Sequence, residues 1–192
     1  QEKSKEKDLQ KKYSDKIYKF VINHSNEFNG ILTNSFNIKI ENFIHEIQKN
    51  LLSKIKRMCK ISKARGNLSD KNILENMEAA LKSAFYMHFR YLYNYRKELN
   101  ISNEFASAMF YFIREYCYAS MFRYNKEGKF NVPYGGMSYN RKDFSKKIDY
   151  IKSNVIKNYM QKTQIYNLDF ETFCNTINLT EKDFMFLDPP YD

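Results

Sequence analysis

The chain has 192 residues, of which 43% are hydrophobic, and 32 Lys and Arg against 22 Asp and Glu give it a formal net charge of +10. Its 16 Phe and 16 Tyr exclude a disordered tail, because they supply enough apolar surface for a packed core of about one domain. No apolar run approaches the ~20 residues of a membrane span, and the N-terminus alternates Lys and Glu where a signal peptide is apolar, so we expect a soluble, cytoplasmic chain.

The first hundred residues have the apolar spacing of helices. Ala64-Arg65-Gly66-Asn67 interrupts that spacing, and Ser69 or Asp70 can then cap a new helix. Ser102 opens a further helix that is rich in aromatic residues. The predicted helices span residues 9–20, 40–58, 70–95 and 102–120.

The pattern changes after residue 120. Asn125-Lys126-Glu127-Gly128 has the composition of a turn, and short extended pieces flank it around Arg123 and at Phe130–Val132. Pro133-Tyr134-Gly135-Gly136 ends this unit, and residues 141 to about 160 return to helical spacing. We therefore predict a loop centred on a turn between two helical segments.

The last thirty residues alternate between strand and helix patterns. Gln164–Tyr166 reads as a short strand, Asp169–Ile177 as a short helix and Asp183–Leu187 as a buried strand. Strand, helix, strand is the pattern of a crossover unit in a parallel sheet. The predicted fold class is therefore α/β, mostly helical in this chain, with a sheet that is only begun here.

Asp188-Pro189-Pro190-Tyr191 follows the last predicted strand directly. Two prolines cannot donate to a sheet ladder, so the strand must end there. In an open α/β sheet the carboxyl ends of the strands form the ligand crevice, and this motif would deliver an acid and an aromatic ring to it. The alternative is that the prolines merely terminate a strand and that Asp and Tyr flank the turn.

The positive charge is confined to the middle of the chain. Residues 51–150 hold 19 basic and 9 acidic groups, whereas residues 1–50 hold 9 and 7, and residues 151–192 hold 4 and 6. This distribution indicates contact with a polyanion, and a solvated Lys-rich surface is the alternative.

The cysteines and histidines are few and widely spaced, so they predict neither a disulfide framework nor a metal site and fit a reducing cytosol. We expect Cys117 and Cys174 to be small buried residues, and His88 to be a satisfied interior or surface group. These residues are Cys59, Cys117, Cys174, His24, His45 and His88.

The motif at residues 188–191 resembles the catalytic motif of amino-group methyltransferases that use S-adenosylmethionine. Upstream, Arg114–Tyr118, Met121–Asn125 and Phe130–Gly136, with Gly128 between the last two, resemble the target-recognition region of the Dam-like, D12-class adenine-specific DNA methyltransferases. The two motifs occur in the order of that family and at about its spacing. The resemblance covers residues ~103–192 well, and residues 1–100 only as a helical region.

The resemblance implies a partial Rossmann-like methyltransferase sheet joined to a helical target-recognition region. It divides the chain into a helical region (1–100), a recognition region (101–160) and the start of the catalytic half (161–192). The five glycines include no Gly-x-Gly for a cofactor loop, and the chain starts with Gln, so we expect an internal fragment with little methyl transfer of its own. Ala119 and Ser120 stand where the family has small polar residues.

The resemblance also assigns catalytic roles at the end of the chain. The side chain of Asp188 and the carbonyl of Pro189 would accept the N–H groups of the adenine amino group, and Tyr191 would stack on the flipped base beside Pro190. Asp188 is also a candidate for cofactor contact. S-adenosylmethionine is the implied methyl donor, and no metal is implied.

Arg123 is the candidate for reading DNA sequence, because a guanidinium can pair with the major-groove edge of guanine. Tyr118 could enter the duplex or stack near the vacated base, and Met121 and the segment around Pro133 are further candidates for DNA contact. Lys126 and Lys129 suit phosphates. The alternatives are that Arg123 pairs with Glu127, that Tyr118 is a core residue, and that the lysines only solvate a turn.

The predicted partners are therefore double-stranded DNA and S-adenosylmethionine. Restriction–modification is the expected setting, with a restriction endonuclease of the same specificity as a candidate partner. The sequence leaves two other hypotheses open: a basic helical nucleic-acid-binding module without catalysis, and a methyltransferase that acts on an RNA amino group.

Overall fold

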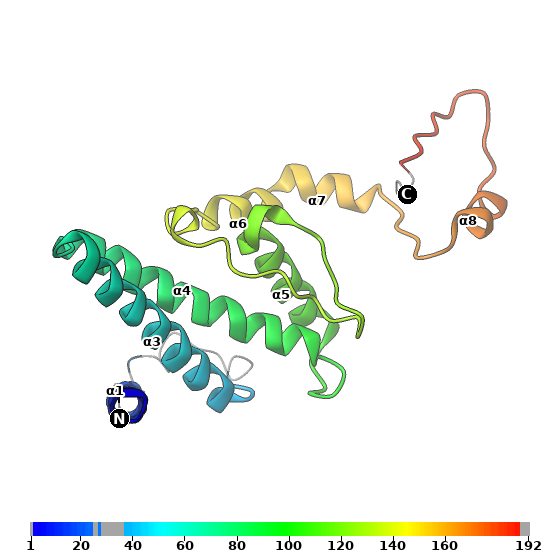
Figure 1. The fold of residues 1–192 in the computed structure, drawn as a ribbon. Coiled ribbons are helices and arrows are strands. Elements are labelled where there is room, and N and C mark those ends of the chain that lie inside the picture. The colour runs from blue at the N-terminus through cyan, green and yellow to red at the C-terminus, as the bar shows by residue number, and fades with distance from the viewer. Residues whose placement is uncertain (1, 25–26, 28–36, 189–192) are drawn as a thin grey trace. The chain divides into compact units, whose positions relative to one another are not determined.

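A computed structural model describes residues 2–24, 27 and 37–188. The chain divides into two compact units, one that ends at Lys142 and one that begins at Asp143. The described helices are α1 (Glu2–Asn23), α3 (Ile40–Arg65), α4 (Asp70–Asn94), α5 (Asn103–Tyr116), α6 (Ser145–Lys152), α7 (Asn154–Gln161) and α8 (Phe170–Thr176), with the short 3-10 helices η1 (Tyr118–Ser120) and η2 (Met137–Tyr139) (Figure 1).

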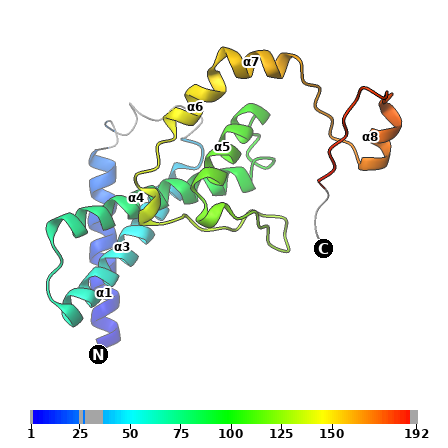
Figure 2. The same cartoon turned by 90° about the horizontal axis from the view of Figure 1, so that it is seen from above.

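Helices α3 and α4 pack side by side in opposite directions (Figures 1 and 2). Gly66 ends α3 with a φ of +93°, which an L side chain rarely adopts, and its N–H donates to the Ser62 carbonyl at 3.0 Å. The Ser69 hydroxyl then caps α4 by accepting the N–H of Asn72 at 3.3 Å. The predicted break at 64–67 and the predicted cap at Ser69 are confirmed.

The first core cluster joins α1, α3 and α4. The apolar residues at helical spacing within 40–58 are buried at most of their positions in α3, and small alanines on α4 face them, which lets the two helices approach closely. His88 is also buried, and its Nδ1 lies 3.1 Å from the Asn42 amide nitrogen, which makes it a satisfied interior group as expected. The buried members of the cluster are Val21, Phe43, Ile44, Ile47, Leu51, Ala80 and Ala84.

The second core cluster joins α4 and α5 to the chain that follows α5. Tyr86 and Ile113 come from the two helices, and Cys117, Phe130 and Val132 come from the loop. All five are at most 1% exposed. Burial raises the pKa of the Cys117 thiol, which suits the small apolar residue predicted there.

Two predicted helices differ in extent from the observed ones. α5 ends at Tyr116 and not near Ser120, because Cys117 is extended and pairs with Tyr134 in an isolated antiparallel bridge. The predicted helix over 141–160 is two helices, since Ser153 is extended and its hydroxyl caps α7 by accepting the Ile156 N–H at 3.4 Å. At Ser153 a local side-chain hydrogen bond takes the place of helical continuation, whereas at Cys117 the pairing partner lies 17 residues farther along the chain.

The unit from Asp143 onward confirms the predicted short helix as α8, which Asp169 caps, but not the two predicted strands. Among the described residues, β pairing is limited to the isolated bridges Cys117–Tyr134 and Tyr124–Phe130. The segment predicted as a buried strand is exposed, with Phe184 at 88%. A parallel strand needs a hydrogen-bonding neighbour, and the described residues around 164–166 and 183–187 supply none. The Rossmann-like sheet is therefore not seen in this part of the chain.

None of the helices described here combines the length and the apolar character that crossing a membrane requires.

Candidate nucleic-acid interface

Residues 117–136 form a loop, here called the 117–136 loop, whose two arms pair with each other. The Tyr118 N–H donates to the Pro133 carbonyl at 2.8 Å, close to the Cys117–Tyr134 bridge. Farther along, the Asn131 N–H donates to the Arg123 carbonyl at 3.2 Å. The predicted extended pieces are therefore present as a two-armed loop without regular strands.

The predicted turn closes the tip of this loop. The Asn125 side-chain oxygen accepts the N–H of Glu127 at 3.0 Å and the N–H of Lys129 at 2.9 Å. Gly128 adopts a φ of +70°, which explains why glycine stands at this position. The tip is thus fixed by its own side chain and backbone.

Three α4 side chains hold the second arm of the loop. Asn94 donates its amide to the Phe130 carbonyl at 2.9 Å and accepts the Phe130 N–H at 2.8 Å. Tyr86 and Arg90 both donate to the Val132 carbonyl at 2.8 Å. Positions 86, 90 and 94 share one helix face, and their spacing was the signal in the sequence that could have identified them as a set.

Arg123 is exposed, and its Nε donates to the side-chain oxygen of Asn131 at 3.0 Å. The alternative partner Glu127 instead lies 3.2 Å from the ammonium of Lys129. Among the described carboxylates none is within ion-pair distance of Arg123. The guanidinium is therefore oriented by an amide and keeps its charge unneutralised.

The aromatic and apolar candidates beside Arg123 lie at the surface. Tyr118 is 56% exposed and Met121 is 39% exposed, so the interpretation of Tyr118 as a core residue is wrong. Pro133 is exposed and is joined to Tyr118 through the hydrogen bond between the arms. Phe122, at 58% exposed, was not predicted as a site residue although it stands between two that were.

The two predicted phosphate-binding lysines differ in their surroundings. Lys129 donates to the Tyr95 hydroxyl at 3.0 Å and lies over that ring, and these contacts, with that to Glu127, raise its pKa. Lys126 is exposed at the tip of the turn. The structure therefore gives Lys129 an internal role in holding the turn to α4 and leaves Lys126 as the better placed of the two for a phosphate.

The base of the loop is fixed by residues that the sequence did not single out. The Ala119 N–H donates to the Tyr139 hydroxyl at 3.1 Å, and Ala119 itself has a φ of +52°. The ammonium of Lys142 pairs with the Glu115 carboxylate at 3.3 Å, next to the Tyr116 ring. These contacts hold the position of Tyr118 from both sides.

The acidic residue of the terminal motif is exposed, and so are the residues from 178 to 187 before it. The prediction for Pro189, Pro190 and Tyr191 lies outside the described residues. Asp188 and the described residues before it do not enclose a cofactor. Within the described residues no three His, Cys, Asp or Glu side chains are grouped as a metal site requires.

The family model for D12 class N6 adenine-specific DNA methyltransferases matches residues 16–192. The chain belongs to this family. The match includes both the 117–136 loop and the terminal motif.

Three curated relatives are similar over part of the chain. The Type II methyltransferase M.CviBI of Paramecium bursaria Chlorella virus NC1A is 38% identical over 45% of this chain and 31% of its own. The Retron Ec67 DNA adenine methylase of Escherichia coli is 31% identical over 52% of this chain and 34% of its own. The Type II methyltransferase M.MjaIII of Methanocaldococcus jannaschii is 36% identical over 44% of this chain and 27% of its own. The chain thus spans about a third of the length of these relatives, and no solved structure matches it.

Proposed function

We propose that this chain carries the target-recognition region, and the start of the catalytic half, of an enzyme that methylates the exocyclic amino group of adenine in duplex DNA. The observation that carries the proposal is the 117–136 loop, whose backbone is held to α4 while Arg123 and Tyr118 remain exposed. The family match and the relatives named as DNA adenine methylase and Type II methyltransferases support it.

In this proposal the recognition region at residues 101–160 reads the DNA. Arg123 makes a bidentate contact with a guanine edge, and the Asn131 bond to its Nε leaves both terminal nitrogens of the guanidinium available for that contact. Tyr118 stacks on a base or fills the space of the flipped one, with Met121 and Pro133 beside it. Lys126 contacts a phosphate and fixes the position of the loop without reading sequence.

The terminal motif supplies the chemistry in the same proposal. The Asp188 carboxylate and the Pro189 carbonyl accept the two N–H groups of the adenine amino group, which turns the nitrogen lone pair toward the methyl donor. Tyr191 stacks on the flipped base next to Pro190. S-adenosylmethionine supplies an electrophilic methyl group when it is bound.

The setting that we propose is restriction–modification in a reducing cytosol. The relatives M.CviBI and M.MjaIII are named as Type II methyltransferases, and all three cysteines of this chain are unpaired. A restriction endonuclease that cuts the same DNA sequence would be the matching partner.

Recognition is tested with the 192-residue chain. The chain first selects a preferred duplex from a random-sequence library, and its affinity is then measured for that duplex and for a scrambled one. Arg123→Ala should cost about 1–3 kcal/mol on the preferred duplex and much less on the scrambled duplex. Lys126→Ala should weaken both equally and lower the salt slope by about 1. Equal losses on both duplexes for Arg123→Ala would refute base reading by this residue.

Catalysis is tested in a protein that contains this chain and transfers methyl groups from labelled S-adenosylmethionine to DNA. Asp188→Ala should abolish transfer and leave DNA affinity nearly unchanged, because the acceptor acts mainly in the transition state. Normal turnover in this variant would show that the motif only terminates a strand.

A further inference from the structure

The second half of α3 carries a concentrated positive charge that lies outside the 117–136 loop. No Asp or Glu occurs between residues 47 and 69. The cations between residues 53 and 65, here called the basic end of α3, are Lys54, Lys56, Arg57, Lys60, Lys63 and Arg65.

Three cations of the basic end make no ion pair with the described residues. Arg57, Lys60 and Lys63 are exposed, and no described carboxylate lies within ion-pair distance of any of them. The pKa of Lys54 is lowered by burial and, in addition, by repulsion from Arg57. Lys54 and Arg57 thus lie close enough to repel each other.

Two of these cations lie on the face of α3 that is next to the loop. A pocket of about 250 Å³ is lined by Asn42 and Glu46 from α3, together with α4 side chains and the loop residues Lys129 and Asn131. Positions 42, 46, 53, 57 and 60 recur at intervals of four, seven, four and three, so they share one face of the helix. Arg57 and Lys60 therefore continue the surface that begins at the loop.

The spacing along α3 fits a duplex that extends past the loop. Lys60 lies fourteen residues beyond Glu46 on the same helix, which is about 21 Å at 1.5 Å per residue. At 3.4 Å per step along one DNA strand, this is about six base pairs. A duplex that contacts the loop and follows this face of α3 would bring a flanking phosphate to Arg57 and Lys60.

We propose that Arg57 and Lys60 form a second DNA-backbone contact on the DNA that flanks the bases read by the loop, with Lys60 about six base pairs along α3 from Glu46, which lines the pocket beside the loop. The proposal rests on the proposed function, since it takes duplex DNA as the partner. It adds a site that supplies affinity on flanking DNA, carries no sequence information and depends strongly on salt.

The test compares duplex lengths. A 5-base-pair hairpin duplex, about 14 Å between its end steps, is too short to reach both the loop and the basic end, whereas a 28-base-pair duplex can reach both. Arg57→Gln with Lys60→Gln should weaken binding of the long duplex on the order of ten-fold at low salt and lower its salt slope by about 1.8, at about 0.9 per phosphate. Affinity for the hairpin should stay within about two-fold of the parent chain.

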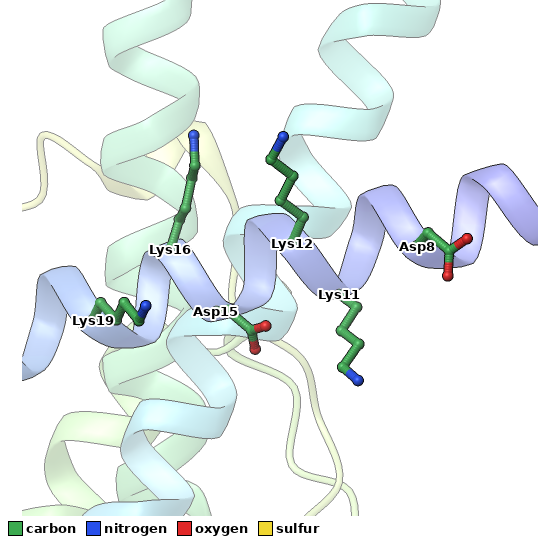
Figure 3. A pocket seen from close by; sticks show the side chains of 6 residues that line it. All are labelled: Asp8, Lys11, Lys12, Asp15, Lys16 and Lys19. Atoms are coloured by element: carbon green, nitrogen blue, oxygen red, sulfur yellow. The ribbon is translucent and has the colours of Figure 1, made fainter.

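Lys12→Gln with Lys16→Gln is the matched control. Figure 3 shows these two lysines extending from one side of α1, with Asp8 and Asp15 on the other side. Like the test variant, the control removes two positive charges from exposed helical positions. It should leave the affinity for both duplexes unchanged. Glutamine is a good helix former, so both double variants should melt like the parent chain.

If the Arg57→Gln, Lys60→Gln variant lost affinity equally for the long and the short duplex, only the net charge of the chain would matter. If its affinity for both were unchanged, these side chains would only be solvated. Either result overturns the proposal. The proposed function fails by a different result, namely no preference of the parent chain for any duplex sequence. The two failures are therefore distinguishable in one set of measurements.

Discussion

Asn94→Ala tests whether side chains of α4 hold the 117–136 loop in place. The Asn94 amide makes two hydrogen bonds to the backbone of Phe130, one to the carbonyl at 2.9 Å and one from the N–H at 2.8 Å. It therefore takes the place of a neighbouring strand for this residue. Phe130 is 1% exposed and belongs to the second core cluster, so its backbone groups have little access to water once Asn94 is removed.

A buried backbone group that loses its partner costs about 1–3 kcal/mol, and two groups lose theirs here. Because Asn94 itself is only half-buried, some water can enter the vacated space. We therefore expect the free energy of unfolding to fall by about 2–3 kcal/mol, nearer the lower value for each group.

Tyr86→Phe is the matched comparison. It also removes a hydrogen bond from α4 to the loop, but the Val132 carbonyl keeps its second donor, Arg90, at 2.8 Å. The expected loss is about 1 kcal/mol, because no backbone group is left without a partner. Urea unfolding followed by far-ultraviolet circular dichroism measures both variants. A loss for Asn94→Ala that is smaller than the loss for Tyr86→Phe would refute the reasoning.

Three further outcomes are expected. Ser69→Ala should lower the stability by about 1 kcal/mol in the same unfolding assay, because the α4 cap is lost. Gly128→Val should lower the free energy of unfolding by at least about 1 kcal/mol, because residue 128 has a φ of +70°. An unchanged free energy of unfolding would contradict the turn geometry. Burial raises the pKa of Tyr124 and of Tyr134 to about 12, which favours their neutral forms in the folded state. The free energy of unfolding should therefore be constant below pH ~10 and fall as the pH rises toward 12. The absorbance of the phenolate forms should appear in the same pH range.

The helical part of the fold could be predicted because its signals are local. Helical spacing located α3, and Ser69 and Ser102 marked the starts of α4 and α5 by the side-chain hydrogen bonds that the structure shows. The turn at Asn125–Gly128 was likewise identified from its composition, and both its side-chain bonds and its positive φ are present.

The errors arise where tertiary partners decide the structure. The apolar segment at residues 183–187 has the composition of a strand, but a strand also needs a neighbour, and composition does not reveal whether one is present. Helical spacing likewise continues past Tyr116, yet Cys117 pairs with Tyr134, which lies 17 residues farther along the chain. The Tyr86, Arg90 and Asn94 set was missed because its spacing marks only a shared helix face, and the backbone groups that it binds carry no sequence signal of their own.

The second arm of the loop combines two tasks because side chains alternate along extended backbone. Phe130 and Val132 are buried and bonded to α4, whereas Asn131 between them holds the Nε of Arg123 at 3.0 Å. The same three residues therefore attach the loop to the helix and orient the guanidinium that we propose reads DNA. Since Arg123 is exposed and makes no ion pair with the described residues, its substitution should change DNA discrimination without changing stability. A variant at Asn94 should instead lower stability first, and lose discrimination only because Asn131 is then no longer held.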